Sequence, residues 1–281
     1  MQVRFWGVRG STPTPQPENM RYGGNTPCVE VRRNGRLYVF DCGTGLRNLG
    51  KQWAQEFVGS PIEAHIFISH FHWDHIQGIP FFVPLYDPQN RFVFHSSNHA
   101  YGFREIIEGQ MIEPYFPVDM SHMAARRSFR VLDEGRRQFD GCWLETRWLN
   151  HPQGCLGFRL ETPEGVLVYA TDNEPGPAKF DAAVRELARS ADVLIYDAQY
   201  SPEEYATKRR GWGHSHWREA VSVAHDSGAR ELILFHHDPD QTDSRLDALV
   251  RSAAKYHPNV RAAAEGMEIC LSQMCEDIKA V

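Results

Sequence analysis

Residues 70–75 read HFHWDH and bring three histidines and one aspartate together within six positions. The chain has 14 histidines among 281 residues, and this spacing arises by chance in roughly one of several hundred such chains. Protonated imidazoles would repel one another here, whereas imidazoles that bind a metal ion are neutral and donate their second N–H to a neighbouring group. The stretch therefore predicts a metal site.

The residues before this stretch predict how its side chains are arranged. Residues 64–69, AHIFIS, are apolar and rich in β-branched and aromatic side chains, which predicts a buried strand. His70 and His72 are two positions apart and share one face of an extended backbone, while Asp74 and His75 fall in the following loop or first helical turn. Loops at strand ends are where a sheet presents functional side chains.

The pattern outside this stretch predicts one α/β domain spanning 1–281, with sheets inside and helices outside. Short apolar runs between glycine turns indicate strands in the first third, and strands and helices alternate after residue 142. Apolar side chains at helical spacing mark 184–191, 217–224 and 246–253 as amphipathic helices. Residues 98–140 are irregular, and we expect them to form a cap or an interface insertion.

Composition argues against several classes of protein. The formal net charge is -6, so no overall positive field attracts the chain to nucleic acid or to an anionic membrane. No stretch approaches the roughly 18 apolar residues of a membrane span. The N-terminal MQVRFWGVRGST lacks the apolar core of a signal peptide, and we expect a cytoplasmic protein.

Further histidines and aspartates follow other predicted strands, and they complete a candidate set of metal ligands. The set exceeds what one ion accepts and suits two ions, with the carboxylate of Asp172 as the natural bridge. No cysteine belongs to the set, so Zn²⁺, Mn²⁺ and Fe²⁺ all remain open. The seven candidate ligands are His70, His72, Asp74, His75, His151, Asp172 and His236.

This pattern resembles the metallo-β-lactamase fold hydrolases, and within them the branch of ribonuclease Z and cyclic-nucleotide phosphodiesterase-like proteins. The resemblance rests on HFHWDH, on YDAQY (196–200), on GWGHSHWREAVSVAHDSGARELILFHH (211–237), and on FWGVRGSTPTP, RYGGNTPCVEV and DCGTGLRNLG in the first 50 residues. It implies a single-domain αββα sandwich. It also implies that one ion is bound by His70, His72 and His151 and the other by Asp74, His75 and His236, with Asp172 bridging.

The same resemblance implies roles for residues that are not ligands. His214, in the GHS motif, is the expected general acid, and Asp197 stands where ribonuclease Z usually has a glutamate. The shorter side chain leaves the Asp197–His214 contact open, while Asp74 is also a candidate to relay the nucleophile's proton. Asp41 is either a brace for the metal loop or a helix N-cap.

Together these features predict a metal-dependent phosphodiesterase in which a metal-bridged hydroxide attacks phosphorus and His214 protonates the leaving group. Two divalent ions, Asp74, Asp172 and a hydroxide leave a site charge of about +1, which suits a small anionic phosphodiester. We expect a 3′,5′-cyclic nucleotide as the substrate and no extended nucleic-acid binding, because the chain is acidic and lacks a long basic arm.

Three alternatives stay open. A ribonuclease Z-like RNA-processing endonuclease is supported by the GHS motif and by the basic cluster 208–210. A lactonase-type hydrolase of the same fold and a non-enzymatic metal-binding module are the others. Arg9 is a candidate phosphate contact, and His216, His237 and Asp238 are unassigned. The apolar segment 103–123 predicts a cap that stacks on a nucleobase, a homodimer interface or a flap that covers the core.

Overall fold

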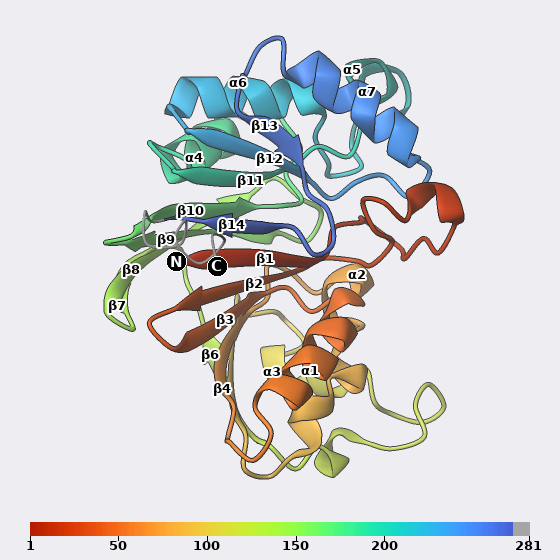
Figure 1. Cartoon of the computed structure of the whole chain (residues 1–281), viewed down its shortest axis with the longest axis vertical. Coiled ribbons are helices and arrows are strands. Elements are labelled where there is room, and N and C mark those ends of the chain that lie inside the picture. The colour runs from red at the N-terminus through yellow and green to blue at the C-terminus, as the bar shows by residue number, and fades with distance from the viewer. Residues whose placement is uncertain (272–281) are drawn as a thin grey trace, which may run out of the picture.

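The computed structural model describes residues 1–271 as two packed β-sheets with helices on the outer face of each sheet (Figure 1). This arrangement confirms the predicted αββα sandwich. The last ten residues of the predicted domain, 272–281, lie outside the described residues. Among residues 1–271, no helix has both the length and the hydropathy needed to span a bilayer.

Within residues 1–271, each sheet has seven strands. The first has the order β14-β1-β2-β3-β4-β5-β6, with β1 (Gln2–Gly7), β2 (Cys28–Arg33), β3 (Arg36–Phe40), β4 (Glu63–Phe67), β5 (Arg91–Ser96), β6 (Arg126–Val131) and β14 (Glu268–Cys270). The second has the order β13-β12-β11-β10-β9-β8-β7, with β7 (Gly135–Phe139), β8 (Cys142–Leu149), β9 (Cys155–Thr162), β10 (Gly165–Ala170), β11 (Val193–Asp197), β12 (Glu231–Phe235) and β13 (Val260–Ala262).

The helices form the two outer layers. They are α1 (Gly45–Glu56), α2 (Trp73–Ile76), α3 (Phe103–Glu108), α4 (Ala178–Leu187), α5 (Pro202–Glu204), α6 (Trp217–Ser227) and α7 (Asp243–Ala253), with a π-helical turn η5 (Tyr205–Arg209) between α5 and α6. The second and third predicted apolar stripes lie in α6 and α7, whereas the first, 184–191, begins in α4 and continues past the end of this helix at Leu187. Buried residues of all three stripes pack on the second sheet. α1 buries Leu46, Leu49 and Trp53 in the cluster on the outer face of the first sheet.

Aromatic side chains fill the space between the two sheets. Phe40 stacks on Phe67 within the first sheet, with 5.1 Å between ring centroids. It also contacts Phe158 and Tyr169 of the second sheet at 5.6 and 5.5 Å. Each such buried ring stabilises the fold by about 1.5–3 kcal/mol, and the layer fixes one sheet on the other.

The strand directions explain why the candidate ligands meet. β3 to β6 are parallel, as are β10 to β13, so the carboxyl ends of each set lie along one edge of its sheet. Asp41 follows β3, His70 comes soon after β4, Asp172 follows β10, Asp197 ends β11 and His236 follows β12. The sandwich therefore brings residues far apart in sequence to one edge.

Residues 98–140 contribute two strands to the sandwich, β6 and β7. β6 pairs with β5, and β7 pairs with β8, as edge strands of the two sheets. The part before β6 contributes Phe103, Met111 and Met123 to the cluster that covers the first sheet. A homodimer interface in this segment stays a prediction.

Candidate metal centre

The seven predicted ligands lie together at the strand-end edge. Their nitrogen and oxygen atoms form overlapping groups in which all atoms are within 4.8 Å of one another. Two of these groups coincide with the sets that the resemblance implied for the two ions: His70, His72 and His151, and Asp74, His75 and His236.

The second group has the spacing of a tetrahedral site. His75 Nε2 lies 3.3 Å from His236 Nε2 and 3.3 Å from Asp74 Oδ2, and His236 Nε2 lies 3.2 Å from Asp74 Oδ2. Asp172 Oδ2 adds a fourth atom, 3.3 Å from His75 Nε2 and 3.4 Å from His236 Nε2. Ligands about 2.0–2.1 Å from a tetrahedral zinc are separated by roughly 3.3 Å, so these atoms fit one divalent ion.

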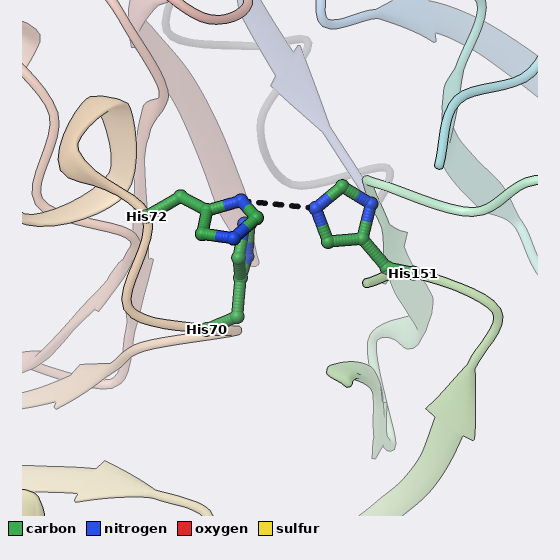
Figure 2. Close-up of side chains that lie close together, drawn as sticks. All are labelled: His70, His72 and His151. Carbon is green, nitrogen blue, oxygen red and sulfur yellow. Dashed lines mark hydrogen bonds between the residues drawn. The ribbon is translucent and has the colours of Figure 1, made fainter. Parts of the chain in front are cut away.

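The first group joins two distant parts of the chain. Figure 2 shows His70 and His72, from the loop after β4, facing His151, which follows β8. His72 Nδ1 lies 3.1 Å from His151 Nε2, and this pair is the dashed line in the figure. His70 Nε2 is buried and has no hydrogen-bond partner within residues 1–271. A buried imidazole nitrogen without a partner beside two others fits a metal ligand.

Asp172 spans the two groups. Its Oδ1 lies 3.8 Å from His70 Nε2 and 3.7 Å from His151 Nε2, while its Oδ2 faces His75 and His236. The backbone at Asp172 has φ 54°, and the left-handed conformation of a residue other than glycine costs about 1–3 kcal/mol. The strained residue is therefore the one whose carboxylate presents one oxygen to each of the two ligand groups.

The electrostatic environment holds several of these side chains in the form that binds metal. Burial lowers the pKa of His70 well below its ordinary value and lowers that of His151 to about 4. Burial raises the pKa of Asp172, but His236, His75 and His70 outweigh it and hold this pKa well below the usual range. At neutral pH these groups are neutral imidazoles and an ionised carboxylate.

His75 differs from the other imidazoles. Burial lowers its pKa, but the carboxylates of Asp74, Asp172 and Asp41 outweigh burial and raise the pKa well above its ordinary value. The three carboxylates thus make a positive charge at His75 electrostatically favourable. A divalent cation held by His75, Asp74 and Asp172 would supply this positive charge in place of the proton.

Asp41 braces the metal loop and is not a helix cap. Its Oδ2 accepts hydrogen bonds from His75 Nδ1 (2.8 Å), Ser69 Oγ (2.8 Å) and Tyr169 Oη (2.7 Å), and its Oδ1 accepts the Ser69 N–H (2.7 Å). The N-cap of α1 is Thr44, so the N-cap interpretation is wrong. Hydrogen bonds of this kind fix the orientation and tautomer of a histidine ligand.

A second brace holds the loop around the GHS motif. Glu174 accepts the backbone N–H of Gly211 at 2.6 Å and of Gly213 at 2.8 Å. The carbonyl of Gly213 in turn accepts the Nδ1–H of His151 at 2.8 Å. Gly213 has φ 85°, and a Cβ there would lie 2.4 Å from His151 Nδ1, so only glycine fits. Gln153 Oε1 orients His72 in the same way, 2.9 Å from its Nε2.

His214 and Asp197 are in contact despite the shorter acid. His214 Nδ1 lies 2.9 Å from Asp197 Oδ2, and the other carboxylate oxygen accepts the N–H of Ser215 at 3.2 Å. Burial lowers the pKa of His214, but Asp197 outweighs burial and raises it above the ordinary value. His214 stacks on His236 with 4.8 Å between ring centroids. The contact with Asp197 therefore favours the protonated form of His214 beside the candidate metal centre.

Arg9 and the three residues that the sequence left unassigned all have structural partners. Arg9 is fully buried and donates to the backbone carbonyls of Gly23, Asn19, Asp238 and Gln241, so its guanidinium is not directed at a substrate. The other three act locally: His216 caps α6, His237 donates to the carbonyl of Ala263, and the Asp238 carboxylate accepts the N–H of Asp240.

Sequence reasoning missed the supporting residues Ser11, Ser69, Gln153 and Glu174. The Ser11 N–H donates to Asp74 Oδ2 at 2.7 Å, from a residue 63 positions away. Only Ser69 carried a local signal, since it directly precedes HFHWDH. The other three contact the site through the tertiary fold, and no spacing in the sequence indicates them.

Comparison with known proteins agrees with this geometry. The family described as "Beta-lactamase superfamily domain" matches residues 36–237. Ribonuclease Z of Haloarcula marismortui is 27% identical, and the match covers 95% of this chain and 96% of the relative. Ribonuclease Z of Salinibacter ruber is 30% identical, and the match covers 74% of this chain and 78% of the relative. The metallo-beta-lactamase fold protein YhfI from Bacillus subtilis superposes with a TM-score of 0.71 at 16% identity, covering 95% of this chain and 98% of YhfI. That last likeness shows the fold alone.

Proposed function

This chain belongs to the beta-lactamase superfamily, and from that premise we propose that it is a binuclear metal-dependent phosphodiesterase that cleaves RNA. One observation carries the reaction class. Asp172 presents its two oxygens to two separate ligand groups, and one of these groups has tetrahedral spacing. Two metal ions in such a site supply a nucleophile from water at neutral pH and neutralise the phosphoryl oxygens.

The side chains of the protein have two tasks in this reaction. Asp74, held by the Ser11 N–H at 2.7 Å, accepts hydrogen bonds and is placed to hold the proton of the attacking nucleophile. His214, whose Nδ1 is directed at Asp197, has Nε2 left to donate a proton to the departing oxygen. Six of the seven candidate ligands are buried, and the lower local dielectric strengthens each of these interactions.

The choice of RNA replaces the cyclic nucleotide that the sequence favoured. Relatives named ribonuclease Z align with 95% and 74% of this chain. The basic cluster 208–210 directly precedes the GHS motif in the sequence. Arg209 lies over the ring of Trp212 at 4.4 Å, and Trp212 is 56% exposed. A cation beside an exposed aromatic ring suits a phosphate and its neighbouring base.

A small cyclic nucleotide stays as a second candidate, favoured by the net charge of -6. The two substrates differ in how many phosphates the protein must neutralise. Binding of folded RNA weakens steeply between about 50 and 200 mM salt, whereas turnover of a single phosphodiester changes little.

The test is to incubate the purified protein with precursor tRNA, with a linear dinucleotide and with 3′,5′-cyclic mononucleotides, in Zn²⁺ and in Mn²⁺. We expect RNA cleavage that falls steeply with salt and that is lost on charge reversal of Lys208, Arg209 and Arg210. Charge reversal of Arg251 and Lys255, exposed on and just beyond α7, is the control and should have little effect. Turnover of cyclic mononucleotides with inert RNA would instead select the second candidate.

The metal requirement is tested separately with Asp172→Asn. Elemental analysis of the wild-type protein should approach two ions per chain, and the variant should hold fewer and lose activity, since one carboxylate serves both groups. Full activity in the variant with a single ion would contradict the binuclear reaction.

A further inference from the structure

A pocket of about 260 Å³ opens directly beside the candidate metal centre, and His70 and His72 form part of its wall. Pockets that enclose a whole drug-sized ligand are usually about 300–1,000 Å³, so this one matches a single ring system. Because two predicted metal ligands line it, a ring bound there belongs to a molecule whose phosphate lies at the metal centre.

The far wall of the pocket is aromatic. Phe71 comes from the HFHWDH stretch, while His99 and Tyr101 come from the loop after β5. The rings of His99 and Tyr101 are stacked, with centroids 5.3 Å apart and planes inclined by 27°. Phe71 contacts His99 edge-on at 6.0 Å and packs on the buried Phe103 at 5.6 Å, which holds Phe71 in place. Tyr101 is 78% exposed and presents ring surface to solvent.

Polar groups line the same pocket and could pair with the edge of a ring. Ser97 offers a hydroxyl group, and Asn98 and Gln153 offer amides. Gln153 is already fixed, because its Oε1 lies 2.9 Å from His72 Nε2. An aromatic wall with donors and acceptors at the rim is the combination that receives a nucleobase, since every base has a π-face and a polar edge.

We propose that this pocket binds the base of the nucleotide whose phosphodiester is cleaved, with Tyr101 and His99 as the stacking surface. The inference rests on the proposed phosphodiesterase function and assigns to that site a subsite for one base of the substrate. It also assigns a role to Phe71 of the HFHWDH stretch. The histidines and the aspartate of this stretch are candidate metal ligands, and Trp73 is solvent-exposed.

The kinetic test compares two esters with the same leaving group. Thymidine 5′-(p-nitrophenyl phosphate) carries a base, and methyl p-nitrophenyl phosphate does not. The wild-type protein should prefer the thymidine ester in kcat/KM by about tenfold, the factor typical of one base–aromatic stack. Tyr101→Ala should raise KM for the thymidine ester and leave the methyl ester unchanged, while Tyr101→Phe should behave as wild type.

Tyr115→Ala is the matched control, because Tyr115 is 79% exposed and lies outside the pocket lining. Calorimetric titration of the metal-loaded protein with thymidine 5′-monophosphate supplies a readout that does not need turnover, and Tyr101→Ala should weaken this binding about tenfold. Absence of hydrolysis of both esters and of precursor tRNA would refute the proposed function. Hydrolysis without base preference, or monophosphate binding that ignores Tyr101, would overturn the pocket assignment alone.

Discussion

Replacing Asp41 with asparagine should weaken metal binding without removing a single ligand. Asp41 is fully buried, and its oxygens accept four hydrogen bonds of 2.7–2.8 Å. Three of the donors, His75, Ser69 and Tyr169, meet at Oδ2, and one, the Ser69 N–H, meets Oδ1. The substitution conserves volume, so any effect reports on charge and hydrogen bonding.

The geometry predicts the orientation of the asparagine amide and the loss in hydrogen bonding and metal affinity. With its oxygen at the Oδ2 position, the asparagine keeps three donors and faces the Ser69 N–H with an NH₂ group. A lost hydrogen bond to a charged acceptor costs about 1.5–3 kcal/mol, and disturbed partners of histidine ligands weaken metal affinity about 10- to 100-fold. The ion held by His75 should be affected first. The ion at His70 feels the change only through Ser69 Oγ, which lies 3.1 Å from His70 Nδ1.

Competition with a chromophoric zinc chelator measures the two affinities, and elemental analysis measures stoichiometry. Asp140→Asn is the matched control, because Asp140 also accepts a tyrosine hydroxyl, from Tyr38 at 2.7 Å, and makes no contact with the ligand set. The control should bind both ions as the wild type does. If both zinc affinities are unchanged in Asp41→Asn, Asp41 does not brace the ligands. If the ion at His70 is lost before the ion at His75, the predicted order of the two effects is wrong.

Three further predictions concern separate features. His214→Ala should keep its metal and lose roughly 10²–10⁴ in rate on diesters with alkoxide leaving groups but much less on an aryl diester; equal losses would remove it as the acid. Glu174→Gln should lower the unfolding free energy by about 1–3 kcal/mol in chemical denaturation, because an amide cannot accept both N–H groups that the carboxylate holds; unchanged stability would contradict this. Burial and the neighbouring His65 hold the pKa of His95 at about 3, whereas the unfolded chain takes up that proton near pH 6.5, so stability should fall as pH falls below about 6.5. The loss by pH 5 is about 2 kcal/mol, and His95→Phe should remove it; an identical pH slope in the variant would be the contrary result.

The sequence alone determined the fold class and the identity of the candidate ligands. Regular spacing of apolar residues indicated the strands and helices. An element that buries one face repeats its apolar residues with the period of its own backbone geometry. The HFHWDH stretch alone predicted that four of the seven ligands lie close together, because they fall within six residues. Their spacing depends only on the local backbone at the end of a strand and in a short helix. The distant members, His151, Asp172 and His236, were recognisable because each follows an apolar strand.

Only the tertiary structure decided which atoms meet. The parallel order of the strands brings Asp41 to His75, and the packing of one sheet on the other places Asp172 between two ligand groups. Glu174 and Gln153 support the site from loops whose sequence has no periodicity, so their role depends on where the fold places them. The sequence did not indicate the two edge strands within 98–140, because strand pairing is a non-local interaction and short polar strands such as β7 show little hydrophobic period of their own.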